Sequence, residues 1–350
     1  MTSTEEEMGP LERVGIGDIA AAAGVSVATV SRVLNGRVDV APQTRTRVLT
    51  EIRRRRYASN RTPHPRRAER TGLIGVMIPE VTGGYFSEFV AGIVEALEER
   101  ELHPVISATH QDAEREREVL GRLSGGVTDG AILVMPVASV PQLPPLYHQG
   151  YLHVVLDPAV PVHETTPVVM ASHRMGARVA TDHLLARGHR RIGVVTGQPA
   201  GLSSIERLAG YREALDTAGV AFDEALVHRG DYLFDGGWAA ANELLATSAR
   251  PTAIFAFNDA MAAGVVRAAA ENGIAVPGSL AVVGFDDAEL ARYGTPPLTS
   301  VRQPLRDMGR SAVRLLCDLL DERVVEARRL MLDTRLVVRA STDWTCLNDR

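Results

Sequence analysis

The sequence predicts a small all-α head at the N-terminus, joined by a linker to an α/β core of two parallel-sheet subdomains. Three short helical patterns lie within residues 14–57 of the 350-residue chain. A segment rich in proline and arginine, residues 60–71, follows them. Beyond it, apolar runs of strand length alternate with longer helical patterns in two series, with a break near residues 157–172. Such alternation is typical of parallel sheets that are covered on both faces.

Local signals mark the first two helices of the head. Ile16–Ala23 (IGDIAAAA) carries apolar residues at helical spacing, and Gly24 allows a sharp turn after it. Ser26 is a good N-cap for a second helix over Val27–Leu34, because its hydroxyl can accept a free backbone N–H of the first turn.

A third helix is expected to support the first two. Asn35 and Gly36 end the second helix, and Pro42 is well placed as the first residue of a third that runs to about Arg56. The residues expected to turn inward from it are Val48, Leu49 and Ile52. Two helices joined by a glycine-bearing turn, with a third packed on them, form a helix-turn-helix module, which places its second helix in the major groove of DNA.

Charge is distributed unevenly along the chain. Residues 1–70 hold 13 arginines against eight acidic residues, whereas the remainder holds 25 arginines against 35 acidic residues, and no lysine occurs. A cationic head on an acidic body favours a polyanion as the partner of the head.

Several classes of protein are disfavoured. No run of 18 uncharged apolar residues occurs, and the acidic N-terminus is unlike a signal peptide, so we expect a cytoplasmic protein without membrane contact. The two cysteines, Cys317 and Cys346, lack metal-ligand spacing, so no metal site or disulfide is expected. The chain contains no G-x-S-x-G, Walker or H-E-x-x-H motif, and its glycine-rich residues 193–201 match no dinucleotide fingerprint. We therefore expect no cofactor and no catalysis. A hydrolase or dehydrogenase with an accessory helical domain, and a sugar-binding receptor, are the alternatives.

Polar side chains follow the predicted strands of the core. Asp157 follows HVVL, Asn258 follows AIFAF, Asp286 follows AVVGF, and Arg207 opens the helical run into LAGY. Ligands of open parallel sheets bind beyond the carboxyl ends of the strands, so these groups are expected to converge on ligand hydroxyls. The aromatic rings available for stacking are those of Phe86 and Tyr232.

The chain resembles the LacI family of bacterial repressors. In the head, the runs DIAAAAGVSVATVSRVLNG and VAPQTRTRVLTEIRRRRY carry the resemblance. In the core, over about residues 72–345, the runs RGHRRIGVVTG, SSIERLAGYREAL and PTAIFAFNDAMAAGVVRAAAENGIAVPGSLAVVGFDDAELARYGTPPLTSVRQP resemble the periplasmic-binding-protein-like (type I) domain of the same family. The resemblance implies a DNA-binding transcriptional regulator, expected to be a repressor. It would bind a palindromic operator as a homodimer and respond to a small-molecule effector such as a sugar.

The expected organisation has four parts. They are a disordered tail over residues 1–12, a helix-turn-helix domain over 13–58, a linker over 59–71 and the effector-binding and dimerisation core over 72–345. Within the core we expect one subdomain over about residues 72–160 and 301–328, and a second over about 161–300 and 329–345. No leucine heptad follows Trp344, so no tetramerising extension is expected.

The resemblance also implies the roles of single residues. Base reading falls to Val27, Ala28 and Arg32, of which the arginine can pair bidentately with guanine. Phosphate contacts, which set register without reading sequence, fall to Ser26, Thr29, Ser31, Asn35 and Thr44. The implied effector residues, beside Phe86, are Asp157, Ser203, Arg207, Tyr232, Asn258, Asp286 and Gln303.

The linker departs from the family pattern. A hinge helix usually forms here on DNA, and a leucine from each subunit wedges into the minor groove. In this chain the leucine position is Arg66, and Pro65 would cost a hinge helix about 3 kcal/mol. Arg66 is expected to enter a narrow minor groove through its charge instead, with less bending and more salt dependence.

Overall fold

The computed structural model of the chain describes residues 16–34, 40–54, 70–81, 84–137 and 151–343. Contacts between residues divide the chain into a small N-terminal unit and a large core unit. The two units are described in turn.

The N-terminal unit is a three-helix head made of α1 (Ile16–Ala23), α2 (Val27–Leu34) and α3 (Pro42–Arg54). Its apolar core consists of Ile19, Ala20, Ala23, Val30, Val33, Val40 and Val48. The predicted helix starts are confirmed, but Leu49 was expected inside and is 39% exposed. Position 49 is one residue past the buried Val48, a rotation of about 100° that carries the side chain to the rim of the helix contact.

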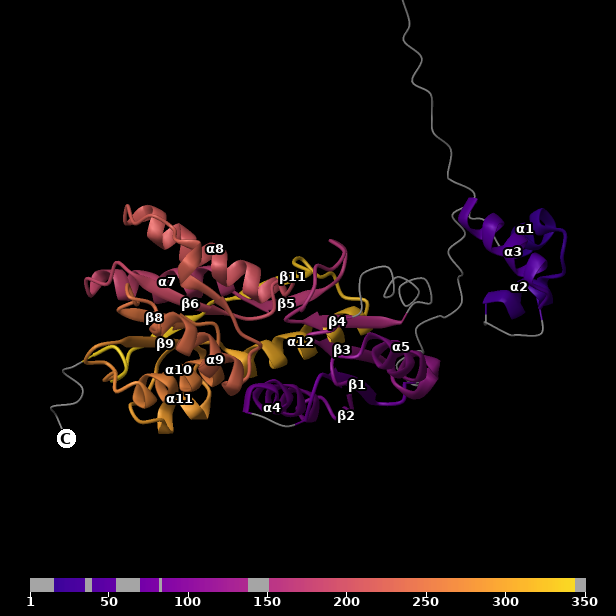
Figure 1. Cartoon of the computed structure of the whole chain (residues 1–350). Coiled ribbons are helices and arrows are strands. Elements are labelled where there is room, and N and C mark those ends of the chain that lie inside the picture. The colour runs from indigo at the N-terminus through magenta and orange to yellow at the C-terminus, as the bar shows by residue number, and fades with distance from the viewer. Residues whose placement is uncertain (1–15, 35–39, 55–69, 82–83, 138–150, 344–350) are drawn as a thin grey trace, which may run out of the picture. The chain divides into compact units, whose positions relative to one another are not determined.

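The first sheet of the core has the strand order β11-β5-β4-β3-β1-β2, and all its pairings are parallel. Its strands are β1 (Leu73–Ile78), β2 (His103–Ala108), β3 (Gly130–Val134), β4 (Leu152–Leu156), β5 (Val168–Ala171) and β11 (Arg329–Leu332). Helices α4 (Gly84–Glu98) and α12 (Leu305–Leu320) pack with this sheet, and α5 (Ala113–Arg122) continues into a π-helical turn at Leu123–Val127. We call this layered body subdomain 1 (Figure 1).

The second sheet has the order β12-β10-β9-β8-β6-β7, and within it only β12 runs antiparallel. Its strands are β6 (Ile192–Thr196), β7 (Val227–Arg229), β8 (Ala253–Ala256), β9 (Ala281–Asp286), β10 (Thr299–Arg302) and β12 (Arg335–Val337). The helices of this half are α7 (His173–Ala186), α8 (Leu202–Thr217), α9 (Phe234–Leu245), α10 (Asp259–Glu271) and α11 (Glu289–Tyr293), with a 3-10 turn at Glu224–Leu226. This second body, with its own hydrophobic core, is subdomain 2 (Figure 1).

The chain passes between the subdomains three times, and each passage lies later than the sequence predicted. β5 and β11 pair in the first sheet, although residues 161–171 and 329–332 were assigned to subdomain 2. β10 pairs in the second sheet as far as Arg302. β5 and β11 are strands of only four residues, so their sequence patterns were too short to assign them to a sheet.

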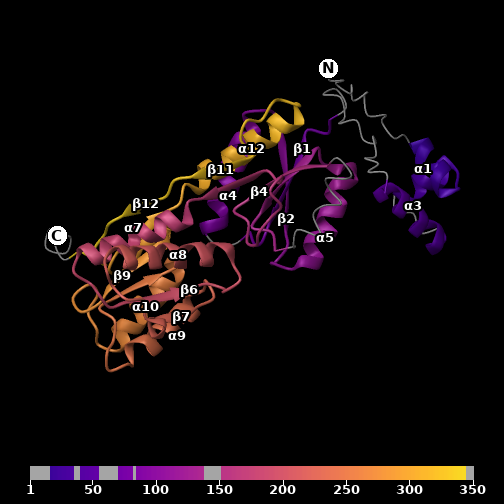
Figure 2. The ribbon, with the colours of Figure 1, turned by 90° about the horizontal axis from the view of Figure 1, so that it is seen from above.

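Two of these passages are joined by hydrogen bonds. After β5, Ser172 accepts through its Oγ from the backbone N of Thr334, which follows β11, at 3.0 Å. The Thr334 hydroxyl also lies 3.3 Å from the carbonyl oxygen of Ser172. The C-terminal passage from β11 to β12 runs beside the body of the core in Figure 2. Two of the three segments that connect the subdomains are therefore hydrogen-bonded to each other.

Glycines let the covering helices cross in backbone contact. A Cβ added at Gly309 of α12 would overlap the carbonyl oxygen of Phe89 in α4, and one at Gly92 of α4 would overlap that of Arg306. Gly210 of α8 meets α7 in the same way, and Gly237 and Gly264 do so between α9 and α10. Because protein interiors are close-packed, side chains larger than hydrogen have no room at these crossings.

Among the described residues, no single helix is long and apolar enough to cross a bilayer. The pair α1 and α2 meets the criterion together only by composition and length, is bent by 98°, and packs its apolar residues into the head.

Candidate DNA-binding and effector sites

The second helix of the head presents an outward face that the head's own packing does not use. Val30 and Val33 are buried, whereas Ala28 and Arg32 are exposed and Val27 keeps 47% of its surface exposed. A valine left in solvent at the start of a helix is unfavourable for folding alone. The three predicted base-reading residues therefore share one exposed surface, and Arg32 is the long donor among them.

Four of the five predicted phosphate-contacting residues lie in the described part of the head. Ser26 caps α2, since the backbone N of Thr29 donates to its Oγ at 3.1 Å, and the two hydroxyls lie 2.9 Å apart. Ser31 and Thr44 are half-buried. Asn35 and Arg66 lie outside the described residues. Gly24 adopts φ +62°, which provides the turn between α1 and α2 that the sequence predicted.

In the core, strained backbone marks the carboxyl ends of strands. Asp157 after β4 has φ +50°, Tyr232 after β7 has φ +69°, and Asp286 at the end of β9 has φ +108°. Non-glycine residues rarely adopt positive φ, and such strained positions are enriched at functional sites. Three of the predicted effector residues are held in this way.

A chain of polar contacts connects the predicted residues across the two subdomains. Tyr85 of α4 donates its hydroxyl to Asp157 Oδ2 at 3.0 Å, and His173 Nε2 lies 2.8 Å from Asp157 Oδ1. Arg207 Nη2 lies 3.3 Å from His173 Nδ1 and 3.8 Å from Asp286 Oδ1. Gln303 Nε2 donates to the same Asp286 oxygen at 2.7 Å. Asp157, His173, Arg207 and Gln303 are all buried.

Arg207 determines the tautomer of His173. A guanidinium can only donate, so His173 Nδ1 accepts from it and Nε2 carries the proton that is donated to Asp157. Arg207 is held further by the carbonyl oxygen of Phe257, to which Nη1 donates, and by the ring of Phe285, whose centroid lies 3.7 Å from its Cζ.

The carboxyl groups of the network experience opposite electrostatic environments. Burial alone would raise the pKa of Asp157, but its contacts with His173, Arg207 and Tyr85 outweigh burial and lower that pKa. Burial raises the pKa of Asp286 to about 7, against the lowering effects of Arg207 and Gln303. Burial and the nearby Asp286 also hold the pKa of Asp259 well above its usual value. Burial, then the charges of Asp157 and Asp286, raise the pKa of Tyr85.

Two polar atoms of this network have no hydrogen-bond partner. Arg207 Nε is a buried donor and Gln303 Oε1 a buried acceptor, and both are unsatisfied. Each side chain contacts Asp286 Oδ1, so the two atoms belong to one locality. Leaving a buried donor or acceptor unpaired costs about 1–3 kcal/mol, so such atoms indicate a place for a ligand.

Tyr232 organises a second group of predicted residues. Its hydroxyl lies 3.0 Å from Ser203 Oγ and 2.7 Å from Ser204 Oγ, at the start of α8. Its carbonyl oxygen accepts from Asn258 Nδ2 at 2.8 Å, while Asn258 Oδ1 accepts from Met261 N and caps α10. The ring lies against Gly197, where a Cβ would overlap it. Both polar ends of Asn258 therefore bind the protein itself.

The aromatic residue that contacts the network differs from the one predicted. Tyr85 binds Asp157, whereas Phe86 lines a groove of about 440 Å³ with Ile78, Val90 and Ile106. Sequence analysis also missed His173. His173 begins α7, two residues after the end of β5, and it reaches Asp157 because β5 pairs with β4, which the sequence did not indicate. Two further aspartates beside the site bind the protein itself: Asp259 accepts from Ser300 and Ala288, and Asp287 accepts from Arg302 and Arg339.

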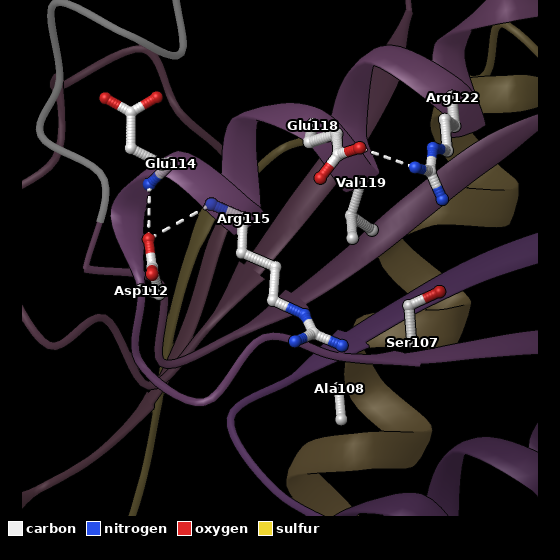
Figure 3. Close-up of a pocket in the computed structure, with 8 residues that line it drawn as sticks. All are labelled: Ser107, Ala108, Asp112, Glu114, Arg115, Glu118, Val119 and Arg122. Atoms are coloured by element: carbon white, nitrogen blue, oxygen red, sulfur yellow. Dashed lines mark hydrogen bonds and ion pairs between the residues drawn. The ribbon is translucent and has the colours of Figure 1, made fainter.

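A larger hollow of about 720 Å³ lies between the end of β2 and α5 (Figure 3). Its polar groups serve the helix: Asp112 caps α5 by accepting from Glu114 N and Arg115 N, and Glu118 pairs with Arg122. None of the predicted effector residues lines it. In the described part of the chain, no group of three or more histidine, cysteine or acidic side chains is arranged to hold a metal ion. The strand-end network is therefore the candidate effector site.

Two family models match the chain. Residues 15–60 match "Bacterial regulatory proteins, lacI family", and residues 181–342 match "Periplasmic binding protein-like domain". Among curated relatives, the HTH-type transcriptional regulator CelR of Thermobifida fusca is 38% identical, with 92% of this chain and 96% of the relative covered. The ribose operon repressor of Escherichia coli (strain K12) is 32% identical, with 93% and 98% covered.

Solved structures agree with these matches. The transcriptional regulator CelR–cellobiose complex has a TM-score of 0.74 at 36% identity and covers 94% of this chain and 100% of that one. The lac repressor dimer bound to operator and the anti-inducer ONPF has a TM-score of 0.71 at 28% identity and covers 95% and 99%. These relatives are regulators of transcription and not enzymes. With its helix-turn-helix head and its periplasmic-binding-protein-like core, the chain belongs to the lacI family of bacterial regulatory proteins.

Proposed function

We propose that the chain is a repressor that binds a palindromic operator as a homodimer in the cytoplasm and is controlled by a neutral sugar in its core. One observation carries the choice of effector: the buried, unpaired Arg207 Nε and Gln303 Oε1 beside Asp286. A hydroxyl accepts and donates at once, so one sugar hydroxyl satisfies both atoms. A fully ionised phosphate group offers Gln303 Oε1 no donor, and the carboxylate of Asp157, whose pKa is lowered, would repel it.

Cellobiose is the first sugar to test, because the CelR relative was solved in complex with it. Besides Tyr85, the site contains the aromatic ring of Tyr232. This ring supports a sugar as the ligand, since sugar rings stack on aromatic faces. Ser203 and Asn258 stand next to it.

Dimerisation is supported by the apolar groove that Phe86 lines on α4. Val81 and Ile106, which also line it, are 67% and 41% exposed. Exposed apolar patches of this kind mark association surfaces. A single recognition helix buries too little surface for tight operator binding, whereas a dimer reads two half-sites.

The test starts with mapping of the DNA fragments that the full chain binds, followed by release with a panel of neutral and phosphorylated sugars. We expect a palindromic site, a dimer by light scattering and a response to a neutral sugar. Arg207→Ala should abolish sugar binding in calorimetry and leave operator affinity within a factor of two. Arg212→Ala on the same helix, where the guanidinium stacks on Phe222, is the matched control. A response to phosphorylated sugars alone would refute the proposed effector class.

A further inference from the structure

Helices α4 and α12 form one rigid strut along subdomain 1. They touch backbone to backbone at Gly92 and Gly309, as described above. Salt bridges join the same two helices: Arg306 pairs with Glu88 and Glu95, and Arg310 with Glu95 and Glu99. Close packing and several charged contacts leave the pair little freedom to slide. We call α4 together with α12 the strut.

One end of the strut lies in the effector network. Tyr85, in the first turn of α4, donates to Asp157. Gln303, two residues before α12, donates to Asp286 and keeps its Oε1 unpaired. A ligand that binds Gln303 therefore acts directly on the beginning of α12.

The other end of α12 holds Arg70, the first described residue at the end of the linker. Arg70 Nη1 donates to Asp321 Oδ1 at 2.8 Å, and Nη2 donates to the carbonyl oxygen of Leu320, the last residue of α12. Arg70 and Asp321 are 18% and 24% exposed, so the contact is largely screened from water. At about 1.5 Å per residue, the 16 residues of α12 place this contact about 24 Å from the start of the helix.

A separate contact anchors the two residues that follow Arg70. The carboxylate of Asp129, in the loop before β3, accepts from Thr71 N at 2.8 Å and from Gly72 N at 3.0 Å. This second anchor belongs to the sheet. The chain at the end of the linker is thus tied to the sheet through Asp129 and directly to the end of α12 through Arg70.

We propose that Arg70 is a positioning residue that couples the effector site to the linker of the DNA-binding head. The helix is stiff, so a displacement of Gln303 on ligand binding reaches Leu320 and Asp321 almost undiminished. The Arg70 guanidinium passes it to the chain that leads into the linker. The inference rests on the proposed function, because it needs a ligand in the core and DNA on the head.

The first test measures coupling in the full chain. Operator affinity is determined with and without saturating cellobiose for the wild type, Arg70→Ala and Arg323→Ala. Arg323 pairs with the same Asp321 at 3.4 Å but is 64% exposed and also pairs with Asp318 of α12, so it is the matched control. We expect Arg70→Ala to reduce the cellobiose-induced change in affinity at least fivefold while cellobiose affinity stays within twofold. Arg323→Ala should behave as the wild type. An Arg70→Ala protein with an unreduced change overturns the proposal.

The second test needs no effector, so it separates a wrong effector from a wrong coupling. Amide hydrogen exchange of residues 70–73 is followed in the free full chain. Gln303→Ala should accelerate exchange there several-fold, and it should add nothing in an Arg70→Ala background, because the tie is already cut. Unchanged exchange in Gln303→Ala overturns the coupling even if cellobiose proves to be the effector. If exchange is accelerated in Gln303→Ala but the wild type does not bind cellobiose, the coupling is supported and only the proposed sugar is wrong.

Discussion

Replacing Asp286 with asparagine should stabilise the protein, and more so at high pH. The carboxyl group is buried, with 10% of the side chain exposed, and its pKa rises from 3.8 in the unfolded chain to about 7 in the folded one. A folded pKa above the unfolded one means that the folded state holds the proton more tightly. The unfavourable contribution of Asp286 therefore grows as the pH rises from about 4 to about 7 and is complete above that.

The magnitude follows from linkage. One pKa unit corresponds to about 1.4 kcal/mol, and integration between pH 5 and pH 8 gives a difference of ~2–3 kcal/mol. Asparagine keeps an oxygen for Gln303 Nε2 and tolerates the positive φ of position 286. Asp286→Asn should therefore raise the free energy of unfolding at both pH values, and the increase at pH 8 should be larger than the increase at pH 5 by about that amount.

The assay is urea unfolding of both proteins at pH 5 and pH 8, followed by circular dichroism. Asp287→Asn is the neighbouring control. The side chain of Asp287 is fully buried and bonded to the half-buried Arg302 and Arg339, so its neutralisation removes charge-assisted hydrogen bonds and should cost about 1–3 kcal/mol. If Asp286→Asn has the same effect at both pH values, or loses stability at pH 8, the carboxyl group is not a strained buried charge and the reasoning fails.

Three further predictions concern the head, the strut and the linker. Arg32→Ala should weaken operator binding by ~1–3 kcal/mol per half-site at constant salt, with the circular dichroism spectrum unchanged; wild-type affinity would remove Arg32 from base reading. Gly309→Ala should lower the free energy of unfolding by on the order of 3 kcal/mol, because its Cβ meets the Phe89 carbonyl, whereas Gly121→Ala, with open space around it, should be neutral or stabilising in the same melt. Arg66→Leu should reduce the slope of log affinity against log salt by about 1 per half-site; an unchanged slope in titrations from low to high salt would mean that Arg66 does not reach the phosphates or the minor groove.

The sequence predicted most of the architecture because its signals were local. Ser26 before an apolar run and Pro42 at a helix start act within a few residues, and both helices begin as expected. The apolar runs that end at Asp157 and Asp286 also predicted buried strands with polar residues at their carboxyl ends.

The sequence did not predict contacts that depend on the direction of a side chain around its helix or on the pairing of distant strands. Tyr85 and Phe86 are consecutive in one helix, and about 100° of rotation decides which of them meets Asp157. His173 gains its role only because β5 pairs with β4, which no local pattern announces. The bonds of Asn258 to Tyr232 and Met261 likewise depend on the fold.

The hydrogen-bonded segments that connect the two subdomains limit how the core can respond to a ligand. Three tethers side by side, two of them bonded through Ser172 and Thr334, resist sliding and twisting and leave bending about the line of the tethers as the soft degree of freedom. His173 and Gln303 lie on the tethers, close to that axis. A ligand contact there lies at a short distance from the bending axis, whereas the far end of the 16-residue helix α12 lies at a long distance from it. A rotation about that line would displace the far end of α12, about 24 Å from its start, more than it displaces the residues on the line itself.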